Sequence, residues 1–199
     1  MSKKKIAIIV VLLLLVDQIV KIWIKTNMTL DQSYTVFSDW FFIRFIENPG
    51  AAYGMQLGGD YGKLFLSLFR VCAIGVLAWY IITLVKKHAP KGVMWGLALI
   101  LAGAIGNMID SAFYGLLFSE STWHSAASFL PEGGGYAGFL HGKVVDMLYF
   151  PIVSFTWWDW IPFVGGQPYT FFSPIFNIAD SYITVGVFYL ILFERKYFK

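Results

Sequence analysis

The chain has 199 residues, of which 58% are hydrophobic, 19% aromatic and only 14% charged. In a soluble domain about a quarter of the residues are usually charged, so much of this surface must face something other than water. The composition excludes an ordinary soluble domain and predicts one polytopic membrane domain covering residues 1–199. Cys72 is the only cysteine, which excludes an intrachain disulfide and a cysteine-based zinc site.

Four apolar stretches are long enough to cross a hydrocarbon core, which needs about 20 residues. They cover residues 6–24, 64–85, 92–113 and 174–193. The first stretch follows a cluster of lysines, but no small-residue cleavage site comes after it. We therefore interpret it as a retained span rather than a removed signal peptide.

Basic residues predict how the spans are oriented. Most lysines and arginines lie near the two chain ends and in the short link 86–91 between the second and third stretches. The positive-inside rule therefore places both termini and this link in the cytoplasm. Segments 26–63 and 114–173 then face outward.

Both outward segments have recognisable local patterns. Residues 34–46 are rich in β-branched and aromatic residues and predict strands, which lead into the turn-forming run 47–54. Residues 144–164 are also apolar, but Asp146, Pro151 and a cluster of tryptophans argue against a fifth crossing. We predict an interfacial or re-entrant segment there.

Acidic residues inside the spans are the strongest indication of function. A charge at the centre of a span costs about 2.5–3.5 kcal/mol, so each one needs a reason. Asp17, Asp110 and Asp180 all lie in the outer halves of their spans, and Asp146 lies in the outer segment. This topology predicts that polar groups from three helices and one outer segment converge in one layer.

Several of these polar residues also have a purely structural interpretation. Asp17 and Lys21 are spaced i,i+4, which predicts a structural ion pair. Asn107 and Asn177 each precede an aspartate by three positions, so they either hydrogen-bond between helices or belong to a site. Asp110 could be a structural partner of backbone or asparagine groups.

Asp146 and Asp180 are harder to explain structurally, because Asp180 has no basic residue close by on its own segment and Asp146 has only Lys143, three positions before it. Two carboxylates held together near a low-dielectric layer cannot both ionise, so one keeps a proton near neutral pH. The ionised member can take a proton from an attacking water, while the protonated member hydrogen-bonds the carbonyl oxygen of a substrate. The pair therefore predicts aspartic protease chemistry.

Two other classes of function compete with this interpretation. The intramembrane carboxylates could relay protons or bind cations in a small transporter, or they could be packing groups of a non-catalytic scaffold. Transport favours polar groups along the whole membrane depth, whereas the inner halves of these spans are nearly uncharged. The sequence contains no H-E-x-x-H, G-x-S-x-G or phosphate-loop motif.

Five ordered blocks of residues carry a family resemblance. They are Asp17-Gln18-Ile19-Val20-Lys21, Glu47-Asn48-Pro49-Gly50-Ala51-Ala52-Tyr53-Gly54, Gly106-Asn107-Met108-Ile109-Asp110, Val144-Val145-Asp146-Met147 and Phe176-Asn177-Ile178-Ala179-Asp180. With these blocks the chain resembles lipoprotein signal peptidase, the bacterial signal peptidase II family of aspartyl proteases (family A8). The resemblance covers nearly the whole chain and is far more specific than a lone Asn-x-x-Asp.

The resemblance implies an α-helical integral membrane protein with four transmembrane helices, a small extracytoplasmic β-rich cradle and an interfacial segment. It implies a hydrolase of the bacterial cytoplasmic (inner) membrane, with its active site at the extracytoplasmic face. Such an enzyme removes the signal peptide of prolipoproteins just before a cysteine that carries diacylglycerol. Membrane lipids and globomycin-type cyclic peptide inhibitors are implied partners, and neither nucleic acid, a metal nor an organic cofactor is expected.

The resemblance also assigns roles to individual residues. It implies that Asp146 and Asp180 are the catalytic dyad. The residues implied to bind substrate or support the site are Asn48, Gly50, Ala52, Asn107, Asp110, Asn177, Ala179, Asp17 and Lys21.

The chain departs from the family pattern in two places. The family usually has an arginine after the Gly-Asn-x-x-Asp block, whereas this chain has Ser111. We expect any contact of that arginine to come from elsewhere, with Lys143 or Arg44 as candidates. Segments 112–142 and 151–172 are also longer than the usual family layout and could shape access to the site.

Overall fold

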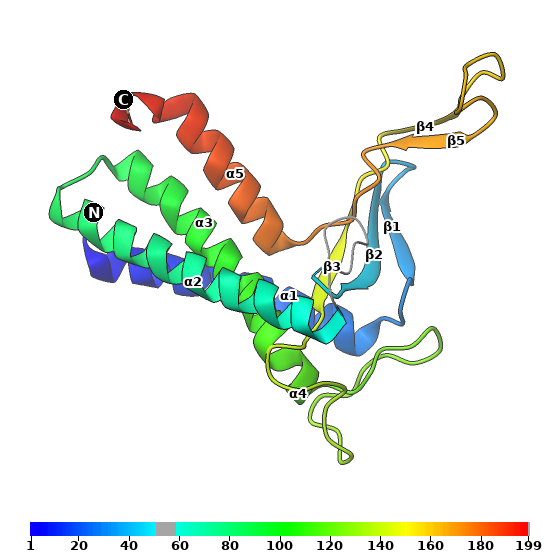
Figure 1. Ribbon diagram of the computed structural model, residues 1–199, viewed down its shortest axis with the longest axis horizontal. Coiled ribbons are helices and arrows are strands. Elements are labelled where there is room, and N and C mark those ends of the chain that lie inside the picture. Colours follow the sequence, from blue (N-terminus) through cyan, green and yellow to red (C-terminus); the bar gives the residue numbers. More distant parts are fainter. Residues whose placement is uncertain (51–58, 199) are drawn as a thin grey trace.

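The computed structural model describes residues 1–50 and 59–198, with the side chains of residues 59–61 excepted. The four long helices of the described residues are α1 (Lys3–Asn27), α2 (Gly59–Lys86), α3 (Lys91–Ile109) and α5 (Ile178–Phe193). The two chain ends and the turn between α2 and α3 lie at one end of this bundle, and the strands lie towards the other (Figure 1). This arrangement matches the order of spans predicted from hydropathy.

Three of the helices are long and apolar enough to cross a membrane: α1, residues 62–86 of α2, and α3 with its extension to Leu117. α5 is apolar but has only 16 residues. The helix is shorter than the predicted span of about 174–193, because Asn177 caps α5 and the helix begins at Ile178. Phe176, just before the cap, bridges instead to Leu148 in an outer strand.

The third span also differs from its predicted form. α3 is α-helical to Ile109, continues as the π-helical turn η2 (Asp110–Tyr114), and ends in the short helix α4 (Gly115–Leu117). A π-helical turn is uncommon and is often found at functional sites. Here it begins at Asp110, one of the carboxylates predicted to matter.

The outer segments form two small antiparallel sheets. β1 (Ser33–Phe37), β2 (Phe41–Asn48) and β3 (Val144–Tyr149) pair in the order β1-β2-β3, which confirms the strands predicted over residues 34–46. β4 (Val153–Thr156) and β5 (Pro168–Phe171) form a separate hairpin that projects beyond the first sheet (Figure 1). Residues 144–164 therefore form β3, β4 and part of the loop that follows β4 instead of a fifth membrane-crossing helix, and β3 attaches Asp146 to β2.

α3 is the central helix, and the other three pack against it. Its contact with α5 is close because glycines face the partner: a β-carbon at Gly103 would lie 2.2 Å from the carbonyl oxygen of Ala179. A β-carbon at Gly186 would likewise lie 2.7 Å from the carbonyl oxygen of Gly96. Small residues of this kind let membrane helices approach closely.

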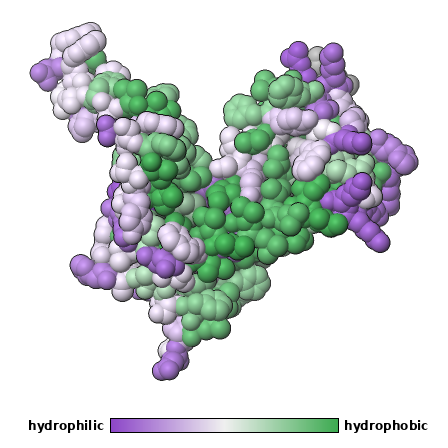
Figure 2. Space-filling model, turned by 180° about the vertical axis from the view of Figure 1, so that it is seen from behind, coloured by the Kyte–Doolittle hydropathy of each residue, from purple (hydrophilic) through white to green (hydrophobic). Residues whose placement is uncertain are grey.

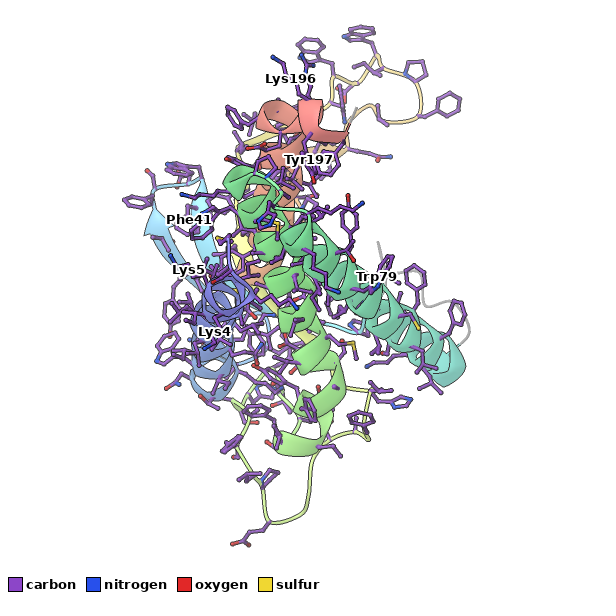
Figure 3. The ribbon with its side chains drawn as sticks, turned by 90° about the vertical axis from the view of Figure 1, so that its left-hand side faces the viewer. Lys4, Lys5, Phe41, Trp79, Lys196 and Tyr197 are labelled. Atoms are coloured by element: carbon purple, nitrogen blue, oxygen red, sulfur yellow. The ribbon has the colours of Figure 1, made fainter. Side chains whose placement is uncertain are left out.

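The outward faces of the helices are strongly apolar. Trp79 is 65% exposed and Phe65 73% exposed on α2. Figure 3 looks along the bundle from the end with the chain termini, and there Trp79 extends from α2 while Lys4 and Lys5 mark the start of α1. Figure 2 shows a broad apolar surface with hydrophilic residues mainly at its margins. This distribution suits a lipid-facing bundle.

Candidate active site

Lys21 is the centre of a buried polar cluster between α1 and α3. Its Nζ lies 3.1 Å from Asp17 Oδ2 and 2.9 Å from Asp110 Oδ2, and both carboxylates are buried with it. Nζ also donates a hydrogen bond of 2.9 Å to Asn107 Oδ1. The predicted ion pair between Asp17 and Lys21 is confirmed, and Asp110 is its third member.

Asp17 connects this cluster to α5. Its Oδ1 accepts a hydrogen bond of 3.0 Å from the backbone N–H of Ala179, in the first turn of α5. A β-carbon at Gly106 would lie 2.6 Å from Asp17 Oδ2, so only glycine lets α3 pass this close. Negative charge beside the first turn of a helix is stabilising, since unpaired N–H groups point outward there.

Gln18 is a member of the cluster that we did not predict. Its Nε2 donates to Asp110 Oδ1 at 2.9 Å and to Asp17 Oδ2 at 3.1 Å. The Tyr114 hydroxyl donates in turn to Gln18 Oε1 at 3.2 Å. A polar residue next to Asp17 in an otherwise apolar span was the signal that could have identified it.

Asn177 and Asp180 form the start of α5 by a reciprocal pair of bonds. Asn177 Oδ1 accepts from the Asp180 N–H at 2.9 Å, and Asp180 Oδ2 accepts from the Asn177 N–H at 3.3 Å. This capping box satisfies backbone donors that the first helical turn leaves unpaired. Asn107 Nδ2 of α3 donates to Asp180 Oδ1 at 2.7 Å, so Asp180 is held from two sides.

Asp146 approaches the same place from β3. Its side chain is almost completely buried and accepts a hydrogen bond of 2.6 Å from Asn177 Nδ2 at Oδ1. Asn48 Nδ2, at the end of β2, donates to its Oδ2 at 3.3 Å. Asn177 therefore contacts both Asp146 and Asp180, and its Nδ2 also donates to Asn107 Oδ1 at 3.0 Å. The two acids share an asparagine as a common neighbour.

The surroundings of Asp146 favour its protonated form. Burial raises the pKa of Asp146 to about 7, and the negative charge of Asp180 acts in the same direction. Hydrogen bonds from Asn177 and Asn48 and the charge of Lys21 oppose the rise. A carboxyl with this pKa is partly protonated at neutral pH and can donate as well as accept a proton.

Most of the predicted site residues belong to this connected cluster. They are Asp17, Lys21, Asn48, Asn107, Asp110, Asp146, Asn177 and Asp180. Gly50 lies at its edge, where its N–H donates to Asn48 Oδ1 at 2.9 Å and its φ of +91° suits glycine. Ala179 is fully buried against α3, so its side chain supports helix packing. Ala52 lies outside the described residues.

The expected substitutes for the family arginine were wrong. Lys143 pairs with Glu47 at 3.2 Å, and Arg44 pairs with Asp31 at 2.6 Å. The basic residue next to Ser111 is Arg70 of α2, whose Nη1 lies 3.5 Å from Ser111 Oγ. A single arginine inside an apolar span is costly, and that signal could have identified Arg70 from the sequence.

A second buried ion pair lies beside the site. Lys25, at the end of α1, pairs with Glu47 of β2, and Ser121 Oγ donates to the same carboxylate at 2.8 Å. Burial works to raise the pKa of Glu47, but the charge of Lys25 outweighs it and holds this pKa below its usual value. Glu47 therefore remains ionised and ties the sheet to α1.

Among the residues that the structure describes, no three His, Cys, Asp or Glu side chains gather as a metal site would require. Apolar helices, a small outer sheet and buried acids between them together define a membrane-embedded helical protein with a buried polar centre. Two solved bacterial membrane enzymes share this fold. One has a TM-score of 0.64 at 24% identity and covers 98% of this chain and 89% of that one. The other has a TM-score of 0.63 at 25% identity and covers 96% and 92%.

Sequence comparisons then identify the family. The family described as Signal peptidase (SPase) II matches residues 9–195. The lipoprotein signal peptidase of Porphyromonas gingivalis is 49% identical over 190 residues, which cover 95% of this chain and 82% of that protein. The lipoprotein signal peptidase of Amoebophilus asiaticus is 38% identical over 191 residues, covering 94% and 76%. The chain belongs to the signal peptidase II family and is a multi-pass membrane protease.

Proposed function

We propose that this protease removes the signal peptide of prolipoproteins by cleaving just before a cysteine that carries diacylglycerol. Asp146 and Asp180 are the catalytic pair, and residues 1–199 act as one membrane-embedded peptidase domain. The observation that carries the proposal is the contact of Asn177 with both carboxyl groups, which come from a strand and a helix far apart in sequence. The family membership of the chain supplies the class of substrate.

The chemistry follows from the different surroundings of the two acids. Asp146 is more deeply buried than Asp180 and starts as the protonated member, which donates a hydrogen bond to the scissile carbonyl oxygen. Asp180 takes a proton from water as the water oxygen attacks the carbonyl carbon. The tetrahedral intermediate then collapses, the C–N bond breaks, and the leaving nitrogen receives a proton from the pair.

The remaining polar residues hold the pair in place. Asn107 and Asn177 donate to the two carboxylates and keep them at a fixed separation. Lys21 donates to Asn107 and carries the positive charge nearest to this arrangement on α1. Hydrogen bonds from such supporting residues keep catalytic groups in the geometry that the reaction needs.

The position of the pair suits a lipid-modified substrate. Asp146 belongs to β3 of the outer sheet and Asp180 to the first turn of α5, the end of that helix that lies towards the strands (Figure 1). The acyl chains of diacylglycerol can remain in the lipid while the peptide bond reaches the acids. Excess lysine and arginine at the opposite end favour an inner-membrane orientation with both termini in the cytoplasm and the site facing outward.

Cleavage of a synthetic diacylglyceryl prolipoprotein peptide by purified enzyme tests the proposal. Asp146→Asn and Asp180→Asn are each expected to lower the rate at least about 100-fold, since proton transfer contributes that much or more. Asp39→Asn is the matched control, because Asp39 lies in the exposed turn between β1 and β2. Mass spectrometry of the products identifies the cleaved bond, and a peptide without diacylglycerol tests the lipid requirement.

Near-wild-type cleavage by either dyad variant would contradict the catalytic assignment. Equal cleavage of the lipidated and unmodified peptides would contradict the proposed substrate while leaving the dyad intact. Thermal unfolding of each variant in detergent confirms that a lost rate does not reflect a lost fold.

A further inference from the structure

Arg70 of α2 lies at the edge of the proposed active site. Its Nη1 is 3.5 Å from Ser111 Oγ in the π-helical turn η2. A β-carbon at Gly50 would lie 3.6 Å from Nη1, so the guanidinium also adjoins the end of β2. Ser111 Oγ donates in turn to the Asn107 carbonyl at 3.0 Å. The guanidinium thus stands between α3 and the backbone that leads away from Asn48.

This guanidinium interacts electrostatically with both acids of the proposed dyad. The negative charges of Asp180 and Asp146 both act on Arg70. Among the side chains of residues 1–50 and 62–198, however, no carboxylate lies within ion-pair distance of it. Arg70 therefore interacts with both acids through space, without a direct ion pair to either.

Most of the hydrogen-bonding capacity of Arg70 is unused among the described residues. A guanidinium has five N–H donors in a rigid planar fork, and the bond to Ser111 at 3.5 Å is long for a hydrogen bond. Lys21 makes a useful contrast, since two carboxylates and Asn107 surround its ammonium group. Arg70 is half-buried in an apolar span, and no side chain of residues 1–50 and 62–198 compensates its charge in this way.

A peptide substrate supplies hydrogen-bond acceptors for the unused donors of this guanidinium. Its backbone carbonyl oxygens lose water when the chain enters a site between helices, and each then needs a donor. Gly50 has no side chain that could shield the guanidinium, and the small Ser111 leaves room for the longer side chain from α2. Arg70 therefore brings a guanidinium from α2 to the place where Ser111 of η2 and Gly50 at the end of β2 come together.

We infer that Arg70 is a substrate-contacting residue of this protease, binding backbone carbonyl oxygens beside the scissile bond with its planar fork. Its positive charge also favours the ionised state of the dyad that activates water. The inference rests on the proposed function of Asp146 and Asp180. In this chain Ser111 stands after Asp110, where the family usually has an arginine. Arg70 of α2 would then supply the positive charge that the arginine supplies in other members.

The test compares four variants with the wild type in the lipopeptide assay over a range of pH. Arg70→Gln is expected to lower kcat/KM about 10- to 100-fold, as loss of hydrogen bonds from a charged donor does. The acidic limb of the kcat/KM profile of Arg70→Gln is expected to move to higher pH, because the dyad loses a nearby positive charge. Arg70→Lys keeps the charge but not the fork, so KM is expected to rise while the acidic limb stays in place.

The remaining two variants are a control and a rescue. Arg44→Gln removes an arginine that pairs with Asp31 away from the dyad, and it is expected to stay within about 2-fold of the wild type. Arg70→Gln combined with Ser111→Arg returns a guanidinium from α3, and is expected to recover at least about 10-fold of the lost kcat/KM.

Failure of this inference can be distinguished from failure of the proposed function. Inactive Asp146→Asn and Asp180→Asn enzymes together with an Arg70→Gln enzyme of unchanged KM and pH profile would overturn the role of Arg70 alone. Active dyad variants would overturn the function itself. If Arg70→Gln does not fold, Arg70→Lys decides the question, and an unchanged KM for that variant would contradict the fork contact.

Discussion

At the scale of single residues, Asn177 joins most of the proposed site. Its side-chain oxygen caps α5, and its side-chain nitrogen donates to Asp146 and to Asn107. The same residue therefore starts a helix and positions one acid of the proposed catalytic pair. An aspartate here would keep the cap but would add a third negative charge, which explains why an amide suits this position.

The pKa of Asp146 leads to a prediction about pH. Burial and the charge of Asp180 raise this pKa to about 7, and Asp146 is the proposed proton donor. The value of kcat/KM is therefore expected to fall as pH rises through about 7, because the free enzyme loses its donated proton. Bound substrate excludes more water and favours the neutral acid further, so kcat is expected to fall only at higher pH.

The pH profiles of kcat/KM and kcat can be measured separately from initial rates with the lipopeptide substrate. A range of roughly pH 5 to 9 covers the pKa values of most catalytic acids and bases. A kcat/KM that stays flat through this range would contradict a protonated Asp146.

The pH dependence of folding stability supplies an independent check. The pKa of Asp146 lies above its ordinary value of 3.8, so its contribution to folding is complete below that value and is lost as pH rises through about 7. The unfolding midpoint of Asp146→Asn should not show this loss.

At the scale of elements, the glycine face of α3 determines where α5 lies. Gly103 lets the Ala179 carbonyl approach, and Asp180 is the next residue along α5. Asn107 is one helical turn after Gly103 on α3, and it contacts Asp180 directly. The close packing of these two helices is therefore also what brings the asparagine within hydrogen-bond distance of the acid.

Gly103→Ala should disturb this arrangement. The new β-carbon would lie 2.2 Å from the Ala179 carbonyl oxygen, which is backbone, so α5 has to shift. We expect a stability loss of about 1–3 kcal/mol, as for other overpacked cores, and a fall in activity of at least about 10-fold. Thermal unfolding in detergent and the lipopeptide assay measure the two effects.

Gly75→Ala on α2 is the matched control for this substitution. Apart from its chain neighbours and the nearby backbone of α2, no atom of the described residues lies within 4 Å of a β-carbon placed at Gly75. Alanine is favoured over glycine in a helix by up to about 1 kcal/mol, so this variant should be as stable as the wild type or slightly more stable. Equal effects of the two substitutions would show that helix packing at Gly103 is not the cause.

At the scale of the whole molecule, the apolar surface and the distribution of charge support the proposed orientation in a membrane. Lys4, Lys5 and Lys196 lie at the end of the bundle that carries both termini (Figure 3). The two sheets and the loop 119–142 lie towards the opposite end (Figure 1). The predicted inside and outside surfaces are thus separated by the lipid-facing helices.

Cysteine labelling tests this orientation. Cys72 is exposed on α2 and is the only native cysteine, so Cys72→Ser provides a cysteine-free background. His88→Cys in the α2–α3 turn and Glu132→Cys in the outer loop then place single thiols at opposite ends. In intact cells a membrane-impermeant maleimide should label only the variant at position 132, and both should react after permeabilisation. Labelling of position 88 in intact cells would contradict the proposed cytoplasmic location of the α2–α3 turn.

Local sequence patterns were sufficient for the membrane class, the helical spans, the strands at 34–46 and the convergence of acids at one level. Hydropathy and charge act over short stretches of chain, so each span can be recognised without knowledge of its neighbours. The blocks around Asp146 and Asp180 also carried the family resemblance. The sequence by itself therefore determined what kind of protein this is and which acids to test.

Only the tertiary structure decided which side chains meet. The shared contact of Asn177, the entry of Gln18 into the Lys21 cluster and the placement of Arg70 beside Ser111 each join segments far apart in the chain. Such contacts depend on which faces of the helices pack together, and close approach along the glycines of α3 selects those faces. Periodicity assigns a residue to a face of its own helix, but only packing assigns that face a partner.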